Sequence, residues 1–464
     1  MKITRREALV TMGAGVAAAA VGHAAHGQTA SQDQSRAGDD STGAKAGDRV
    51  LICNEDSCTL TVIDPVRNAV AETINLTSFD EDPRPPFRFA NAGVIPTYAA
   101  MVGKALYHGG ISIHGGAPSP DQTLAAVTGR GSSNVYLIDM QRLRPLGNRP
   151  NPRAGDATLP ECVTSGVLVG REPHEPTWSR NGQEIWVALR GEDRFALVDV
   201  ALAKRESAGE NVRAVRGYLP TLNGPAQAWF SQDGAVAFVI SQKVPMIEVF
   251  DTNIGSDGFS NPKRRALIDI SAQDPFGFSP FQKVTRDGAE MWVTHKIADG
   301  VSARSIAGDH GLLDHVPLGE KARPNHIEFV ENAKGKVIYA SLGRVDDGGP
   351  GGVASSRIAI IDRAAPMGAR QVVGSFFSHG RESHGLWTNP ENDLLYVAHE
   401  QDELPGTPNE GQTVCSAFDV SDPFQPRFVA QIPLGTLALP SGGLRNKKSI
   451  NLVYYRPGSP MHSG

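Results

Sequence analysis

Short apolar segments recur along the chain, and turns of polar residues and glycine separate them. Residues 114–139 (HGGAPSPDQTLAAVTGRGSSNVYLID) and 174–199 (HEPTWSRNGQEIWVALRGEDRFALVD) align without a gap at an offset of 60 positions. A third copy ends at Asp251, and weaker copies continue as far as Pro423. Self-similarity at a nearly fixed period indicates a repeat architecture.

Each copy contains the same succession of predicted strands. An apolar strand ends at Ser or Thr, a polar turn leads to a second strand, and a third strand of alternating polarity closes on Asp. A weaker fourth strand completes the unit. Alternation with a period of two indicates strands, and four short strands are typical of a propeller blade. The closing aspartates are expected to cap turns: Asp64, Asp139, Asp199, Asp251, Asp362 and Asp419.

The number of copies predicts a seven-bladed β-propeller, an all-β fold with four-stranded antiparallel blades. Six units begin near His114, His174, Pro225, Pro280, Pro324 and Ser383. Residues 50–76 supply only the outer strands of a first blade. Residues 439–455 begin another copy and stop, so we expect them to add the missing inner strand. The ring would then close by strand exchange between the N- and C-terminal repeats.

The first 30 residues have the pattern of a secretory signal. Lys2, Arg5 and Arg6 precede an apolar run from Ala8 to Gly22, and the paired arginines match the start of a twin-arginine signal. This predicts a periplasmic or secreted protein, with an uncleaved anchor as the alternative. No second apolar run of membrane length follows, so no membrane span is expected after removal of the signal.

Composition divides the rest of the chain. Residues 31–47 are polar and predict a disordered linker, residues 48–456 hold the repeats, and residues 457–464 form a short tail. Residues 77–110 do not follow the repeat and predict an insertion over one face.

Charge and composition exclude other classes of protein. The 464 residues carry a formal net charge of -5 without a long run of Lys or Arg, which disfavours a nucleic-acid partner. The 50 glycines and 32 prolines disfavour a helical bundle. Cys53 and Cys58 flank a predicted hairpin turn, where either a disulfide, which an oxidising compartment allows, or a pair of thiols would fit.

The repeats resemble a known propeller family. Residues 48–74 (DRVLICNEDSCTLTVIDPVRNAVAETI), 323–329 (RPNHIEF) and 383–399 (SHGLWTNPENDLLYVAH) are similar to the YVTN-type repeat, and the resemblance covers roughly residues 49–455. It implies the propeller fold. Similar repeats occur in the d-type-haem domain of nitrite reductases, in nitrous oxide reductase, in propeller lactonases and in exported proteins of unknown role. The repeat therefore implies no catalytic residue.

Six histidines recur at corresponding ends of predicted strands. Four open inner strands and two follow second strands: His114, His174, His326 and His384, then His295 and His399. The start of one antiparallel strand lies beside the end of the next, so we expect all six near the central channel on one face. Converging imidazoles suit copper, zinc or haem iron. Alternatively, the histidines pack and bond turns, because a one-residue shift turns a side chain to the other side of its strand.

Three basic residues share the same rim. Arg130, Arg190 and Lys296 each follow a predicted second strand directly. Together with the histidines they favour a small anionic ligand. In the alternative, they pair with nearby carboxylates and seal the rim: Glu172, Glu175, Glu382 and Glu400.

These features predict an exported protein that binds a small ligand or a metal at the mouth of its channel. The sequence leaves open whether it is an enzyme. One alternative is an oxidoreductase that uses the histidine cluster with copper or another transition metal, by analogy with related propellers. Another is a lactonase-like hydrolase with His174 as the acid–base group and Arg190 as the oxyanion partner.

Overall fold

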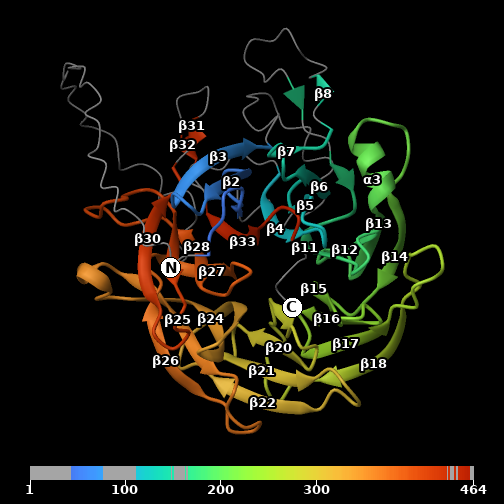
Figure 1. Ribbon diagram of the computed structural model, residues 1–464. Coiled ribbons are helices and arrows are strands. Elements are labelled where there is room, and N and C mark those ends of the chain that lie inside the picture. The colour runs from blue at the N-terminus through green and yellow to red at the C-terminus, as the bar shows by residue number, and fades with distance from the viewer. Residues whose placement is uncertain are drawn as a thin grey trace, which may run out of the picture. The chain divides into compact units, whose positions relative to one another are not determined.

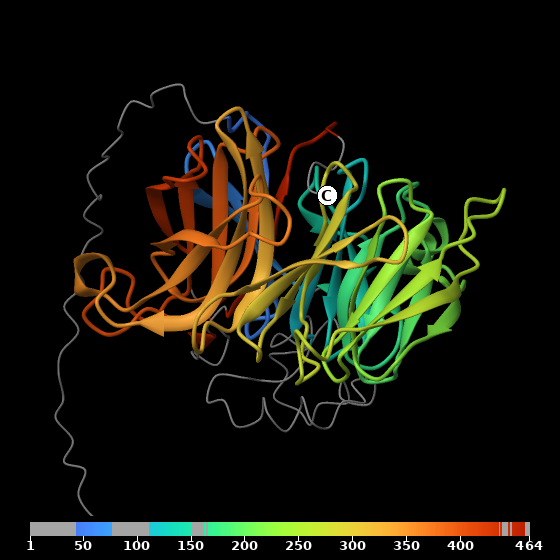
Figure 2. The ribbon, with the colours of Figure 1, turned by 90° about the horizontal axis from the view of Figure 1, so that it is seen from below.

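The structure, a computed structural model, describes residues 43–76, 111–147, 149–150, 162–163, 166–435, 437–438, 444–445 and 448–459. The predicted signal, residues 31–42 of the predicted linker and the predicted insertion lie outside these residues. Seven small antiparallel sheets are arranged around a common centre (Figure 1). The view turned by 90° shows the sheets packed side by side (Figure 2). This arrangement confirms the seven-bladed β-propeller.

Blade 1 is built from two distant parts of the chain. From the outside inwards it contains β3 (Ala69–Asn75), β2 (Thr59–Asp64), β1 (Arg49–Asn54) and β33 (Ser449–Tyr455). β33 pairs antiparallel with β1, with Arg49 opposite Tyr455 and Cys53 opposite Asn451. In Figure 1 the red β33 lies beside the blue strands of this blade. Closure by strand exchange is therefore confirmed.

Blades 2 to 4 each follow one continuous stretch of chain. Blade 2 contains β4 (Ile113–Pro118), β5 (Leu124–Gly129), β6 (Asn134–Asp139), β7 (Arg144–Pro145) and β10 (Val167–Leu168). Blade 3 contains β11 (Pro173–Trp178), β12 (Glu184–Leu189), β13 (Arg194–Asp199) and β14 (Val215–Pro220). Blade 4 contains β15 (Pro225–Phe230), β16 (Val236–Ser241), β17 (Met246–Asp251) and β18 (Lys263–Asp269). In blade 2, β7 and β10 share the outer edge of β6.

Blades 5 to 7 repeat the same order. Blade 5 contains β19 (Gln282–Val284), β20 (Glu290–His295), β21 (Gly300–Ser305) and β22 (Leu312–Pro317). Blade 6 contains β23 (Pro324–Asn332), β24 (Gly335–Asp346), β25 (Ser355–Asp362) and β26 (Val372–Phe377). Blade 7 contains β27 (Arg381–Thr388), β28 (Leu394–Gln401), β29 (Val414–Asp419) and β30 (Arg427–Pro433). Two further pairs are β8 (Arg149–Pro150) with β9 (Cys162–Val163) and β31 (Leu437–Ala438) with β32 (Leu444–Arg445).

Helical structure is scarce in the described part of the chain. It consists of α3 (Val200–Ser207), which leads from β13 to β14, and the single turn η1 (Pro350–Gly352). Asp199 caps α3 by accepting a hydrogen bond from the backbone N–H of Leu202. Neither of these helices is long and apolar enough to cross a membrane.

The innermost strands form a closed ring around the channel. Each contacts the next, in the order β33, β4, β11, β15, β19, β23, β27 and back to β33. Apolar side chains fill the space between sheets; Trp186 of blade 3, for example, lies edge-on to Phe230 of blade 4 at a centroid distance of 5.1 Å. The ring brings the first residues of all inner strands to one end of the channel.

Polar residues at the turns fix the repeat, as the sequence predicts. In three blades a hydroxyl at the end of the inner strand donates to an aspartate two residues later: Ser119 to Asp121, Ser231 to Asp233 and Thr285 to Asp287. Of the aspartates that close third strands, four accept a backbone N–H two residues on: Asp64, Asp139, Asp362 and Asp419. Such local bonds end one strand and orient the next.

Cys53 and Cys58 are buried thiols rather than a disulfide. The Cys58 sulfur accepts a hydrogen bond from the backbone N–H of Ser112 at 3.2 Å. The Cys53 sulfur lies against Gly116 of blade 2. Both thiols therefore pack against the neighbouring blade.

Candidate functional site

Four of the six predicted histidines lie in β-bulges near the start of inner strands. In blade 3 the register of β11 against β12 shifts between Pro173 and Pro176. His174 and Glu175 occupy this bulge. The same kind of shift in blades 2, 6 and 7 surrounds the other three: His114, His326 and His384. A bulge interrupts strict alternation and re-aims side chains, so consecutive residues such as His174 and Glu175 both reach the channel.

The bulges open on a cavity of about 160 Å³ at one mouth of the channel. All four bulge histidines line it, and so do the three predicted basic residues: Arg130, Arg190 and Lys296. The ring of blades thus brings together residues that are far apart in sequence. A smaller cavity of about 30 Å³ has largely aromatic walls and shares only Glu175 with the first.

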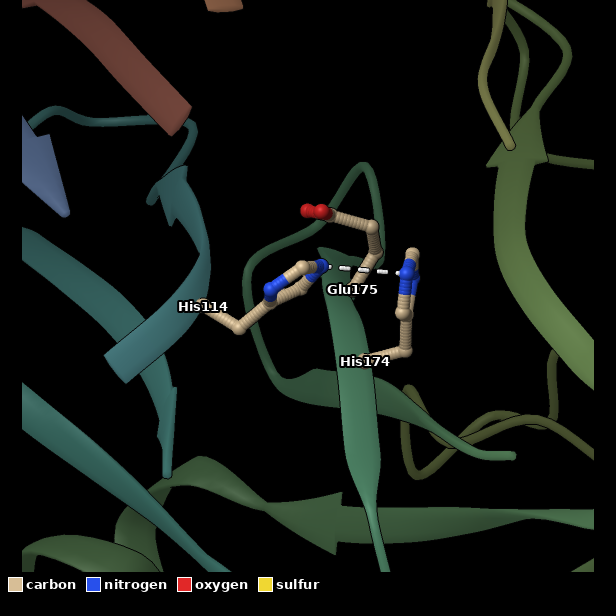
Figure 3. Close-up of side chains that lie close together, drawn as sticks. All are labelled: His114, His174 and Glu175. Carbon is tan, nitrogen blue, oxygen red and sulfur yellow. Dashed lines mark hydrogen bonds between the residues drawn. The ribbon is translucent and has the colours of Figure 1, made fainter. Parts of the chain in front are cut away.

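The closest group of potential metal ligands in the cavity is His114, His174 and Glu175. One potential ligand atom of each lies within 4.8 Å of those of the others. The two Nε2 atoms of the histidines are 3.0 Å apart, and the carboxyl group of Glu175 extends over the pair (Figure 3). All three side chains are buried. His114 comes from blade 2, whereas the other two come from β11 of blade 3.

Hydrogen bonds indicate how the protons are arranged on the two rings. Nδ1 of His174 donates to the backbone carbonyl of Ala226 at 2.9 Å, so the lone pair of this neutral ring is on Nε2. Nε2 of His114 then donates to that lone pair, and Nδ1 of His114 accepts from Arg130 at 3.5 Å. The amide of Gln242 also donates to Nε2 of His174 at 3.2 Å. The lone pair of His174 Nε2 therefore accepts from two donors that both line the cavity.

Burial keeps this group uncharged near neutral pH. Burial, reinforced by the charge of Arg130, lowers the pKa of His114 to about 4. Burial and the neighbouring His114 hold the pKa of His174 well below its usual range. Burial raises the pKa of Glu175 to about 8, although Asn451 donates a hydrogen bond to its carboxyl group at 3.0 Å. The neutral imidazole is the form that binds metals.

Gly115 allows blades 2 and 3 to approach closely at this group. A Cβ atom at position 115 would lie 2.3 Å from the backbone oxygen of His174 and 2.8 Å from a carboxyl oxygen of Glu175. A side chain here would push apart the two strands that carry the ligands. Glycine directly after His114 is therefore part of the site's architecture.

The two arginines of the rim are neutralised by carboxylates. Arg130 forms ion pairs with Glu55 at 2.9 Å and with Glu172 at 2.6 Å. Arg190 pairs with the same Glu172 and donates to Gln242 at 2.7 Å. Burial would raise the pKa of Glu55, but Lys448 and Arg130 outweigh it and hold the pKa well below its usual range. The predicted pairing with Glu172 is thus present, while both arginines still line the cavity.

His326 and His384 form a second pair in the same cavity. Their ring centroids are 4.8 Å apart, and His326 also stacks on Phe281 at 3.9 Å. Nε2 of His384 lies 3.4 Å from a carboxylate oxygen of Glu400. Burial lowers the pKa of both histidines well below the usual range. In the repeat alignment these two histidines are shifted by one residue relative to His114 and His174. Both rings still line the cavity, because each lies in a bulge.

His295 and His399 do not line this cavity. They lie on second strands, β20 and β28, whose pairing with the third strands is regular, so successive residues point to opposite sides. His295 contacts the hydroxyls of Ser279 at 3.0 Å and Ser302 at 2.8 Å. His399 donates from Nδ1 to the carbonyl of Val414 at 3.0 Å, and its Nε2 contacts the hydroxyl of Ser378 at 3.0 Å. Both nitrogens of each ring therefore have partners.

Sequence reasoning missed several cavity residues. Glu55 and Gln242 occupy the position of Arg130 in their own blades, since each donates its backbone N–H to the residue that precedes the inner strand. The repeat alignment contains this signal. The sequence predicts Glu175 only as a partner of the arginines. The bulge that turns this residue toward the histidines cannot be recognised in the sequence. Lys448 lies just before the exchanged strand β33.

Comparisons with known proteins establish the fold. No family model and no curated protein matches the chain. A functionally unknown protein from Desulfotomaculum acetoxidans is 10% identical, with a TM-score of 0.54 over 88% of this chain and 99% of that one. A candidate 6-phosphogluconolactonase from Bacteroides uniformis is 12% identical, with a TM-score of 0.54 over 88% and 100%. Hydrazine synthase from Kuenenia stuttgartiensis is 14% identical, with a TM-score of 0.50 over 74% and 95%. At such low identities, these matches support the propeller fold and carry no information about activity.

Proposed function

We propose that this propeller is an exported metal-binding protein that holds a divalent transition metal, such as zinc or copper, at His114, His174 and Glu175. The main support is the pair of Nε2 atoms 3.0 Å apart, with Glu175 beside them. Metal–nitrogen bonds of about 2.0–2.1 Å in tetrahedral geometry would set the two nitrogens about 3.3–3.4 Å apart. The hydrogen-bonded pair would hold one ion after opening by about 0.3–0.4 Å and after the proton of His114 moves from Nε2 to Nδ1.

The surroundings of His174 give further support. Metal-binding histidines commonly donate their second ring nitrogen to a backbone carbonyl or a carboxylate, which fixes the tautomer and the ring orientation. Nδ1 of His174 makes this bond to Ala226 of the next blade. Two imidazoles and one carboxylate suit zinc or copper better than magnesium or calcium, which prefer oxygen ligands.

The hydrolase alternative has weaker support. It assigns the oxyanion role to Arg190, but this guanidinium already pairs with Glu172 and donates to Gln242. The oxidoreductase alternative needs the same metal site and differs only in what the bound ion does. Metal binding is therefore the first property to measure.

Titration of the metal-stripped full-length protein with Zn²⁺ and Cu²⁺ tests the proposal. We expect one ion per chain, and His114→Ala should weaken binding by at least about 100-fold, because a direct ligand matters more than its surroundings. The matched control is His315→Ala, since His315 is exposed on the outer strand β22, far along the blade from the channel. Equal affinity in wild type and His114→Ala, or no ion in natively exported protein and none on titration, would refute the site.

A further inference from the structure

Lys296 differs from the other cations of the cavity because it has no counter-charge at contact distance. It lines the cavity from blade 5, directly after β20. Its ammonium group forms no ion pair or hydrogen bond with any residue in the described segments, and Glu400 and Glu382 act on it only at longer range. Lys448, by contrast, lies 2.5 Å from Glu55 and 3.9 Å from Glu400. Arg130 and Arg190 are paired as well.

The contact ion pairs around the cavity include every cation of its lining except Lys296. Four cations line the cavity: Arg130, Arg190, Lys296 and Lys448. Glu55, Glu172 and Glu400 are the carboxylates that contact these cations, and their partners are Arg130, Arg190 and Lys448. Lys296 is half-buried at the wall of the cavity, so its ammonium group is available to an anion that enters there.

Glu400 is not the missing partner of Lys296. Its carboxylate lies near Lys448 and near Nε2 of His384 at 3.4 Å, and it makes no contact with Lys296 within 4.0 Å. Burial raises the pKa of Glu400, and burial lowers that of Lys296 even though the charge of Glu400 acts in the opposite direction. Among the described residues, Lys296 therefore has no carboxylate within 4.0 Å on this side of the cavity.

The walls near Lys296 indicate what kind of anion fits. Phe278, Pro280 and Ile450 supply apolar surface to the same cavity. A cation beside apolar walls suits a small molecule that combines one anionic group with a short hydrocarbon part.

We infer that Lys296 binds a small, singly charged organic anion, such as a short-chain carboxylate, in the cavity beside His114, His174 and Glu175. The carboxylate end pairs with the ammonium group of Lys296, and the rest of the molecule lies against the apolar wall, within reach of a metal ion. The orientation toward the metal rests on the proposed function, whereas the pairing with Lys296 does not. Of the three basic residues predicted from the sequence, Lys296 is thus the one whose charged group is available to a ligand.

Binding of acetate and propanoate, followed by NMR line broadening on metal-free and metal-loaded protein, tests this inference. We expect both carboxylates to bind, acetamide not to bind, and Lys296→Met to weaken carboxylate binding at least tenfold. Lys296→Arg, which keeps the charge, should retain most of it. The matched control is Lys243→Met: Lys243 is exposed, follows the cavity residue Gln242 in sequence and does not line the cavity. Near-UV circular dichroism checks that each variant is folded.

The outcomes separate the two proposals. Carboxylate binding that depends on Lys296 in protein unable to bind metal would uphold this inference and refute the metal site. Unchanged binding in Lys296→Met, or no carboxylate binding in either metal state, would overturn this inference and leave the metal titration unaffected. Binding of nitrate without binding of carboxylates would overturn the organic class and identify an inorganic anion instead.

Discussion

The bulge histidines His114 and His174 and the second-strand histidines His295 and His399 are all buried but differ in what their nitrogens face. The first pair directs its Nε2 atoms at each other, next to a protonated carboxyl group, in an open cavity. Each ring of the second pair has hydroxyl or carbonyl partners on both nitrogens. Burial of a histidine in this propeller therefore does not indicate its role, whereas the geometry of the strand that carries it does.

The difference arises from one extra residue in the strand. In a regular strand, neighbours point to opposite sides, so Lys296 faces the cavity while His295 faces the hydroxyls of Ser279 and Ser302. In a bulged strand, His174 and the adjacent Glu175 both face the cavity. A propeller thus gains a polar site by interrupting its inner strands while leaving the second strands to hold the blades together.

The largest expected effect comes from replacing one histidine of each kind. His174→Ala should weaken zinc affinity by at least about 100-fold, because a direct ligand is lost. His399→Ala should change zinc affinity of the folded protein less than threefold. It should instead lower the free energy of unfolding by about 1–3 kcal/mol, since its buried partners lose their hydrogen bonds. Metal titration and urea unfolding of both variants check this contrast, and a large affinity loss in His399→Ala would contradict it.

The second expected effect is the pH dependence of metal binding. The pKa of Glu175 is raised to about 8, so below that pH the metal must displace one proton. Zinc affinity should rise about tenfold per pH unit between pH 6 and pH 8 and level off above. Both histidines have lowered pKa values and add no further proton in this window.

Glu175→Gln is the variant that sharpens this measurement. It keeps the size of the side chain and removes its titration, so the affinity should be lower but nearly independent of pH between 6 and 8. A wild-type slope of zero would show that Glu175 gives up no proton to the ion. A slope that corresponds to two protons released per ion would show that a histidine is also protonated between pH 6 and pH 8.

The fold was predictable from the sequence to a greater extent than the site. The turns that end with Asp139, Asp199 and Asp251 recur in sequence, so blade number and ring closure follow from local patterns. Correspondence between copies also placed Arg130, Arg190 and Lys296 on one rim. The bulges near the start of the inner strands, however, are not visible in the alternation of apolar and polar residues from which the strands were predicted. For this reason the cavity contains Glu175, which the sequence does not predict as a ligand. It does not contain His295 and His399, which the sequence predicts there.

A smaller effect is expected from Gly115, which tests how closely blades 2 and 3 must approach. In Gly115→Ala the new methyl group would lie 2.3 Å from the backbone oxygen of His174, so the strands must shift. We expect a loss of stability of about 1–3 kcal/mol from overpacking and about tenfold weaker zinc binding. Gly217→Ala is the control, because no atom lies within 4 Å of a Cβ atom there. Equal behaviour of the two variants in thermal unfolding and metal titration would argue against a constrained interface.

The smallest expected effect concerns Ser302, whose hydroxyl contacts Nε2 of His295 at 2.8 Å. Ser302→Ala leaves this buried nitrogen without its partner and should lower the free energy of unfolding by about 1 kcal/mol. On the same strand, the hydroxyl of Ser305 makes only exposed bonds, so Ser305→Ala should cost less than about 0.5 kcal/mol. Neither change should alter zinc affinity, which urea unfolding and metal titration can measure side by side. If Ser302→Ala weakened metal binding while stability held, the second-strand histidines would belong to the site after all, and strand regularity would no longer separate the two kinds.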